Sequence, residues 1–359
     1  MTNNKSYFLA SNSGRGYYSF FDKEIINLDY VYLLKGAPGN GKSELIQNIA
    51  SSLNESHVNI ELIYSSFNIN TLDGIINLDK NVGIFDSSFP RSFDNILPKI
   101  TGEIIDLSKT LDESVIKGKS SNIYSIQTRK ETYLEKYSDC IIKARKLHDD
   151  LEKYFSNSIN IEKAQQLNNQ VLNEIFNNTK FLSKESIIKD RFFDSITEKG
   201  NVDFIDNLTS SLQNRYFIKG RPGSGKSTLL KQIVEFAVQR GFNVELYHCD
   251  FDPESLDLII IPELSVCAFD STDPHNYVPQ KRGDKIVDTY QSIIDTNADE
   301  KYKTEIKEGT KKWELSASKA SDYLKEAKVQ HNKMVSIYYE AINKDKFHQI
   351  KQRLRDKMV

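Results

Sequence analysis

The sequence predicts an α/β protein made of two tandem domains, each with a mainly parallel sheet flanked by helices. Three observations lead to this prediction. An octapeptide of the form G-x-x-x-x-G-K-S occurs twice, as GAPGNGKS from Gly36 and as GRPGSGKS from Gly220. Each copy follows a short run of β-forming residues and precedes an amphipathic helical run. The sequence around the first copy also aligns with the sequence around the second.

The two octapeptides have the residues of a phosphate-binding loop. Their glycines allow positive φ angles and a close approach of the backbone, so that successive N–H groups can surround an anion. The lysine would reach the terminal phosphates of a nucleotide, and the serine hydroxyl would bind Mg²⁺. We therefore predict two sites for ATP, or for another nucleoside triphosphate, with Mg²⁺. The predicted nucleotide-binding residues are Gly36, Pro38, Gly39, Gly41, Lys42, Ser43 and Glu44 in the first copy and Gly220, Arg221, Pro222, Gly223, Ser224, Gly225, Lys226, Ser227 and Thr228 in the second.

The flanking segments support this interpretation of the octapeptides. Residues 30–35 and 215–219 are short runs of aromatic and β-branched or other apolar residues, which predict strands. The segments SELIQNIASSL and STLLKQIVEFAVQR follow the loops and space their apolar residues as an amphipathic helix does. A phosphate would then lie at a helix N-terminus, where unpaired N–H groups and the helix dipole favour an anion.

The two loops are corresponding points of an internal duplication. An offset of 184 positions aligns residues 36–90 with residues 220–274 without a gap, and identical residues recur throughout. The similarity resumes, with a slip of one residue, where ARKLHDD aligns with AKVQHNK. We expect two fused domains of one fold, at residues 1–182 and 183–359, because the period is too long for a solenoid repeat.

Each half should contain the same elements in the same order. A second strand, NIELIYSS or NVELYHCD, is followed by a short connection and a third strand, NVGIFD or SVCAFD. Helical segments at about residues 123–177 and 298–357 close the two halves as appended helical lobes. In the first lobe, LHDDLEKYF and IEKAQQLNNQVLNEIF should form a helical hairpin with SNSIN as its turn. A coiled-coil arm is less favoured, because the apolar residues do not keep a heptad spacing.

An aspartate ends the third predicted strand of each half. A phosphate-binding-loop enzyme needs a second acid directed at Mg²⁺ at the end of such a strand. An aspartate followed by serine is also good helix-capping chemistry, and the two roles are compatible. The predicted catalytic residues are Lys42, Lys226, Asp86 and Asp270, and the predicted metal ligands are Ser43, Asp86, Ser227 and Asp270.

The sequence does not supply a general base in the expected position. Many enzymes with such loops have a glutamate directly after the strand-end aspartate, where this chain has Ser87 and Ser271. Asp73 and Asp257 are equivalent acids on the preceding segment, and they are either water-orienting groups or solvated loop residues. Without a positioned base, hydrolysis should be slow, which would favour a switch or a transferase.

The two loops differ at positions that bear on binding. Glu44 adds negative charge beside the first Mg²⁺ ligand, where the second loop has Thr228, so we expect weaker binding at the first site. Arg221 lies within the second loop where the first has Ala37. Its guanidinium would contact phosphate, the other half or solvent.

Five further residues are weaker candidates. Arg91 and His275 follow the strand ends, where ligands bind in open α/β sheets, so they are candidates for phosphate or substrate contact or are exposed turn residues. Asp250 ends the second strand of the second half, a position from which an acid holds the acceptor in some nucleotide kinases. His148 and His331 occupy equivalent helical positions but have no ligand spacing, so we interpret them as helix-face residues or as part of a contact between the halves.

Composition places the chain among ordinary globular proteins. Its 48 basic and 50 acidic residues give a net charge of -2, which provides no global attraction to nucleic acid or to an anionic membrane. Cys140, Cys249 and Cys267 form no CxxC pair, so a metal cluster or a disulfide framework is not expected. The N-terminal residues contain no apolar secretory segment, and no apolar run is long enough to span a membrane. We expect a cytoplasmic protein without a membrane partner.

By these residues the chain resembles the P-loop NTPase superfamily. More narrowly, it resembles a tandem P-loop ATPase family of Gram-positive bacteria, through IKGRPGSGKST, the stretch from LDLIIIPEL to AFDSTDPH, the KLHDD helix and the two-fold duplication. The resemblance covers nearly the whole chain and implies an intracellular, ATP-binding, tandem α/β protein with no particular substrate. The chain departs from that family at Ser271 and Asp273, where small residues are expected.

The expected function is ATP binding, with hydrolysis, at two Mg²⁺-nucleotide sites. The two halves would form an intramolecular pseudo-dimer in which each half completes or regulates the site of the other. One alternative is a small-molecule or nucleoside kinase, which would release a phosphorylated product. The other is a nucleotide-gated scaffold that binds protein or nucleic acid through the helical lobes.

Overall fold

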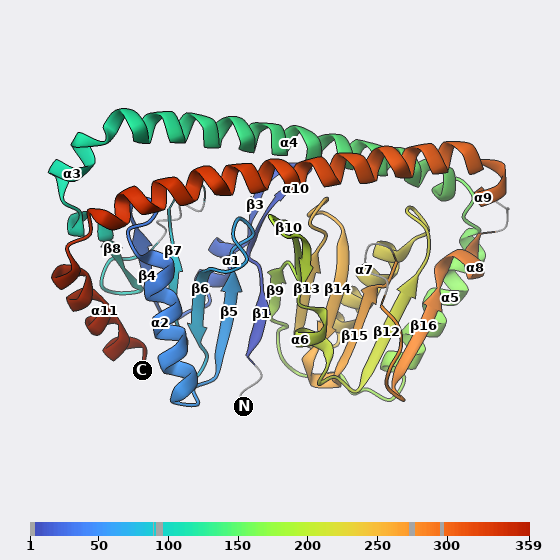
Figure 1. Ribbon diagram of the computed structural model, residues 1–359. Helices are drawn as coiled ribbons and strands as arrows, with labels where there is room; N and C mark the ends of the chain where they lie inside the picture. Colours follow the sequence, from blue (N-terminus) through green and yellow to red (C-terminus); the bar gives the residue numbers. More distant parts are fainter. Residues whose placement is uncertain (1–3, 89, 91–95, 273–276, 295–297) are drawn as a thin grey trace.

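The computed structural model describes residues 4–88, 90, 96–272, 277–294 and 298–359. Within them the protein is α/β, with two six-stranded mixed sheets in two halves (Figure 1). The first sheet has the order β1-β5-β6-β7-β4-β8 and the second β16-β12-β15-β14-β13-β9. The first-sheet strands are β1 (Lys5–Tyr7), β4 (Tyr30–Lys35), β5 (Ile60–Tyr64), β6 (Leu72–Asn77), β7 (Val82–Asp86) and β8 (Gly102–Asp106). The second-sheet strands are β9 (Ile188–Arg191), β12 (Asn214–Lys219), β13 (Val244–His248), β14 (Leu256–Ile261), β15 (Val266–Asp270) and β16 (Asp284–Asp288).

The sheets are mostly parallel, which confirms the coarse prediction of a mainly parallel sheet flanked by helices. One strand in each half departs from it: β6 is antiparallel to β5 and β7, and β14 is antiparallel to β13 and β15. The sequence interpretation treated these segments as connections. They form strands because their apolar residues fill the sheet between two neighbours, and every residue of β6 is buried.

The two halves have the same elements at corresponding positions, so the architecture is duplicated. The strands β4, β5, β6 and β7 recur as β12, β13, β14 and β15 at the sequence offset of 184. The same offset relates a hairpin and a short helix that the sequence interpretation did not identify. These elements are β2 (Ala10–Ser13), β3 (Gly16–Ser19) and α1 (Phe21–Ile25) in the first half and β10 (Asp194–Thr197), β11 (Gly200–Asp203) and α6 (Ile205–Thr209) in the second.

The halves meet edge to edge at equivalent residues. The Phe8 amide donates to the Phe192 carbonyl, and the Phe192 amide donates to the Phe8 carbonyl, each at 2.9 Å. This antiparallel bridge joins the ends of the edge strands β1 and β9. Because each residue contacts its own repeat equivalent, the contact has the isologous form of a two-fold interface. Side chains of both halves also share one buried apolar cluster around it, which includes Phe85 and Phe269.

A buried charge cluster lies beside this joint and breaks the two-fold symmetry. Arg191 is fully buried, and its Nη2 donates to Glu61 of the first half at 2.6 Å. Its Nη1 lies 3.8 Å from Glu245 of the second half, which is the repeat equivalent of Glu61. The position equivalent to Arg191 is Tyr7, and the guanidinium lies 3.9 Å from the centre of that ring. One arginine therefore compensates acids from both sheets.

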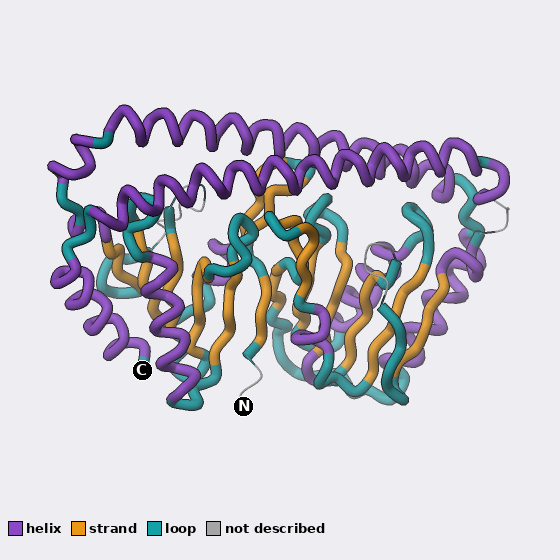
Figure 2. Tube along the Cα trace, in the orientation of Figure 1, coloured by secondary structure: helices purple, strands orange, loops and turns teal. Residues whose placement is uncertain are grey.

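Two long helices cross both halves as an antiparallel pair (Figure 2). They are α4 (Ser120–Ser156) and α10 (Lys303–Glu340), and α3 (Glu113–Gly118) and α9 (Ala298–Lys301) precede them. At the centre of the pair the Ser316 hydroxyl donates to the Cys140 carbonyl at 2.9 Å. Near one end, Ile126 packs with Met334 and Ile337. Each helix thus starts over its own half and ends over the other.

The helices that follow complete this exchange. Helix α5 (Ile161–Phe176) packs on α7 (Lys226–Gln239) and α8 (Thr289–Ile293) of the second half, while α11 (Lys344–Met358) packs on α2 (Lys42–Glu55) of the first. Equivalent isolated bridges, Leu111 with Ile342 and Ile159 with Ile294, fix the two crossings. The expected α4–α5 hairpin is wrong, because the apolar face of α5 is buried in the core of the second half. The short 3₁₀ turns are η1 (Leu107–Thr110) and η2 (Pro262–Leu264).

A helix that crosses a lipid bilayer must be both long and apolar. Within the described residues, none combines sufficient length with sufficient apolar character.

Replacing Arg191 by Met should destabilise the protein by about 3–5 kcal/mol at neutral pH, because it removes the buried cation that is paired with Glu61. Burial raises the pKa of Glu61 and of Glu245, but Arg191 and neighbouring lysines outweigh it and hold each pKa below its ordinary value. This stabilisation is complete above about pH 4.5 and is lost as the pH falls. The difference in the free energy of unfolding between wild type and R191M, measured by urea denaturation, should therefore become smaller in acid.

The matched control is Lys117→Met, which removes an exposed ion pair with Glu113 on α3. It should change the free energy of unfolding by less than about 1 kcal/mol. Equal effects of the two substitutions would show that the buried cluster does not hold the halves together.

Candidate functional site

The two glycine-rich loops lie in equivalent places, each between a strand that is second from the edge of its sheet and a helix of 14 residues. The first joins β4 to α2 and the second joins β12 to α7. Gly41 and Gly225 precede the helices with φ angles of 89° and 83°, a left-handed conformation that L side chains rarely adopt. The backbone N–H groups of each first helical turn therefore open toward the loop, as anion binding requires.

The strand-end aspartates lie next to these loops. β7 pairs in parallel with β4, which places Asp86 beside Leu34, and β15 pairs with β12, which places Asp270 beside Ile218. Asp86 accepts a hydrogen bond from the Ser88 amide at 3.0 Å, and Asp270 accepts one from the Thr272 amide at 2.9 Å. The aspartates thus have the turn role, and they lie at the strand ends beside the loops.

The loop lysines share one equivalent partner, the carbonyl of the residue after the first loop glycine, Ala37 or Arg221. Lys42 is buried, and its ammonium donates to the carbonyls of Gly36 and Ala37 at 2.9 Å. Lys226 donates to the Arg221 carbonyl at 2.9 Å and lies 3.5 Å from the Asp270 carboxylate. The structure therefore brings together Lys226 and Asp270, two of the predicted catalytic residues of the second site.

Several other predicted loop residues point elsewhere. The Arg221 guanidinium lies 3.3 Å from Asp299 and over the Tyr290 ring, so its charge is directed away from the loop interior. The Ser224 hydroxyl shares a 2.7 Å hydrogen bond with Thr289. The Ser227 hydroxyl accepts from the Leu256 amide at 3.1 Å and keeps a lone pair available for a metal ligand role. The side chains of Glu44 and Thr228, which follow the predicted serine ligands, are exposed.

A cavity of about 600 Å³ adjoins the first loop. Its walls are the loop, the β2–β3 hairpin, the ends of β5, β6 and β7, and one face each of α4 and α10. Lys42, Ser43, Asp73 and Asp86 all line it. This volume and this mixture of cations, carboxylates and aromatic groups suit a ligand of nucleotide size.

Each loop is closed by the long helix that comes from the other half. A Cβ atom on Gly39 would lie 2.5 Å from the backbone of Val335 in α10, and one on Gly223 would lie 2.5 Å from the Glu152 carbonyl in α4. Glu152 and Val335 are repeat equivalents at the offset of 183 that holds for these helices. The two sites are therefore composite, and their reciprocal contacts follow the two-fold symmetry.

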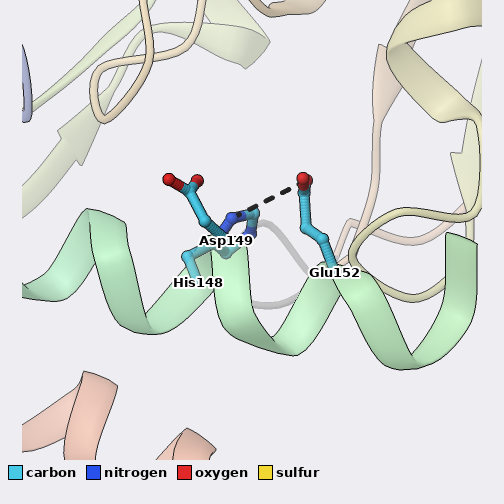
Figure 3. Close-up of side chains that lie close together, drawn as sticks. All are labelled: His148, Asp149 and Glu152. Atoms are coloured by element: carbon cyan, nitrogen blue, oxygen red, sulfur yellow. Dashed lines mark ion pairs between the residues drawn. The ribbon is translucent and has the colours of Figure 1, made fainter.

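The equivalent histidines belong to these crossing helices. His331 of α10 lines the cavity at the first loop, and its ring meets Phe67 edge-on with the ring centres 5.1 Å apart. His148 of α4 lies beside Asp149 and Glu152 (Figure 3) and is 3.8 Å from the Glu152 carboxylate. Burial lowers the pKa of His148, with Lys226 of the second loop adding to the effect and nearby carboxylates opposing it. Sequence spacing could not reveal this, because each histidine reaches the site of the opposite half.

The acids proposed as alternative bases have different environments. Asp73 is buried and faces the first cavity. Asp257 of the second half is half-buried, and its charge adds to the burial that raises the pKa of the Cys249 thiol. Of these two acids, Asp73 therefore has the placement expected of a water-orienting group.

Asp250, the remaining candidate among the described residues, does not line the first cavity. Asp250 is buried beneath the hairpins, where it accepts hydrogen bonds from the Ser11 hydroxyl and from the Ile196 amide, the latter at 2.7 Å. Burial and the nearby Asp194 raise its pKa. It is therefore part of the joint between the halves. Arg91 and His275 lie outside the described residues.

Comparisons of the chain with protein-family models, with curated proteins and with solved structures find no match. The function is therefore inferred from the residues of the two sites.

Substituting Gly39 by Ala should cost more stability than substituting Gly16 by Ala. Both glycines have positive φ angles, 81° and 95°, so both variants carry about 1–2 kcal/mol of backbone strain. A Cβ at Gly16 meets no atom within 4 Å, whereas one at Gly39 collides with the Val335 backbone and must displace α10. Urea denaturation measures the cost, and amide hydrogen exchange should show faster exchange along α10 in G39A alone. Equal costs with unchanged exchange would contradict the contact between loop and helix.

Proposed function

We propose that the protein binds ATP, or another nucleoside triphosphate, with Mg²⁺ at two composite sites and hydrolyses it. The observation that carries the proposal is the arrangement common to both halves. A glycine loop with positive φ angles leads into a helix whose first turn carries Lys and Ser, and an aspartate ends the neighbouring parallel strand. These groups match the charge of a nucleotide's phosphates and their cation.

The residues fit Mg²⁺, which prefers a few hydroxyl or carboxylate oxygens together with phosphate oxygens. In the first site Ser43 and Asp86 would hold it, and in the second Ser227 and Asp270 would do so. When bound, the ion would offset negative charge on the terminal phosphates. Lys42 and Lys226 would supply the second positive charge after leaving their present loop and carboxylate partners.

The reaction is attack of water on the γ-phosphate. The water oxygen bonds to the γ-phosphorus, the bond to the β–γ bridging oxygen breaks, and nucleoside diphosphate, phosphate and one proton are released. Asp73 is the buried carboxylate of the first cavity that would orient this water. The catalytic contribution of the fold is mainly positioning and charge compensation.

The crossing helices α4 and α10 would form part of both nucleotide sites. A nucleotide in the first site would lie against α10, and one in the second against α4, so that each ligand contacts both halves. Binding at either loop would therefore stabilise the docked position of the helix pair. The pseudo-dimer expected from the duplication would then contain two sites, each formed by residues of both halves.

Replacing Lys42 or Lys226 by Ala should remove one nucleotide site each. Loss of a charged hydrogen bond to phosphate costs about 1.5–3 kcal/mol, so the affinity of the changed site should fall by about 10- to 100-fold. Calorimetric titration with Mg²⁺-ATP should give two sites for wild type and one at the same concentration for each variant. Phosphate release, measured in parallel, distinguishes hydrolysis from transfer to a small-molecule acceptor.

Lys117→Ala, at an exposed lysine that does not line the first cavity, is the control and should bind two nucleotides. The proposal is wrong if wild type binds no nucleoside triphosphate. It is also wrong if K42A and K226A each still bind two nucleotides.

A further inference from the structure

Lys130 is a cation in the first cavity that belongs to neither loop. Gln127, Lys130, Leu134, Tyr137 and Ser138 line the cavity and recur at helical spacing, so one face of α4 is turned toward the first loop. Lys130 shares this cavity with Lys42 of the loop and with Asp86 of the neighbouring strand.

The environment of Lys130 is unusual for a lysine. Its side chain is half-buried, and this burial lowers its pKa. Within the described part of the chain it forms no ion pair, although Asp73 and Asp86 line the same cavity. The charge of Glu131 opposes this effect of burial but does not outweigh it. An anion bound in the cavity would offset the remaining cost of burying the ammonium.

The second site has no such cation at the equivalent position. The offset of 183 that relates His148 to His331 relates Lys130 to Trp313 of α10. The Trp313 ring lies 5.8 Å from the ring of Phe251, and Phe251 is the repeat equivalent of Phe67 in the first cavity. The helix face over the second loop therefore presents an aromatic group where the first site has a positive charge.

We propose that Lys130 contacts the terminal phosphate of the nucleotide bound at the first loop, and that the first site turns over while the second holds its nucleotide. The inference rests on the proposed function. As the bond between the γ-phosphorus and the bridging oxygen breaks, negative charge develops on the γ- and β-phosphate oxygens. The Lys130 ammonium stabilises that charge and stays protonated, while the proton of the attacking water goes to solvent.

This assignment reverses the ranking that the loop sequences suggest. Glu44 beside the first serine led us to expect the weaker site there. Its side chain lines the same cavity as Lys130 but is exposed, so solvent screens its charge. The half-buried Lys130 is screened less and acts on the phosphates more strongly. The second loop keeps the groups for binding but has Trp313 in place of Lys130.

The test compares Lys130→Met, Lys130→Arg and the control Lys146→Met, an exposed lysine on the same helix. Each variant is first checked for the wild-type content of two bound nucleotides and for its thermal unfolding. K130M should lower the single-turnover rate of [γ-³²P]ATP hydrolysis by about 100-fold, the loss typical of one charge-stabilising donor. K130R should restore part of the rate, and K146M should retain all of it.

Loop variants assign the turnover to a site. K42A should lose both one nucleotide and the turnover, whereas K226A should lose one nucleotide and keep the turnover. A K130M protein that binds two nucleotides and hydrolyses at the wild-type rate overturns the role of Lys130. Turnover that survives in K42A and disappears in K226A overturns the division of labour. Wild type that binds no nucleotide instead removes the proposed function itself.

Discussion

The compensation of buried carboxylates by Arg191 is the constraint on which the rest of the structure depends. The guanidinium is fully buried where the edge strands meet, and it contacts acids from both sheets. A buried charge without partners is unfavourable by several kcal/mol, so the halves cannot separate without exposing or orphaning these groups. An isolated bridge between Phe8 and Phe192 joins the two sheets at the same place. The joint therefore fixes the relative position of the two loops.

With the joint fixed, the crossing helices can complete sites at a distance from their own strands. α4 and α10 each begin over one half and end against the loop of the other. α5 and α11 then bury their apolar faces on the opposite sheets, which anchors the crossing at both ends. Such an exchange has the geometry of a domain-swapped dimer within one chain. Each loop is thereby in contact with a helix that comes from the other half.

The two halves repeat the same backbone elements but differ in some of their charged side chains. The loops, the strand-end aspartates and the histidines are repeated. The positions of Arg191 and Tyr7, and of Lys130 and Trp313, are not. A duplicated fold needs its contacts in both copies, but an asymmetric residue at the two-fold joint serves both halves at once, and an asymmetric residue over one loop changes one site alone. The two sites thus have equivalent loops and strands but different charged residues around them.

The sequence by itself determined the fold class, the duplication, the loops and the strand-end aspartates, because these depend on local patterns of a few residues. It also located the strands β4, β5 and β7 and the helical segments, whose periodicity is strong. Only the tertiary structure decided the antiparallel strands β6 and β14, since short apolar runs do not reveal their direction. It alone placed α5 and α11 on the opposite sheets, and brought His331 and Lys130 to the first loop. Those placements depend on burial between segments that lie far apart in the sequence, which no local pattern records.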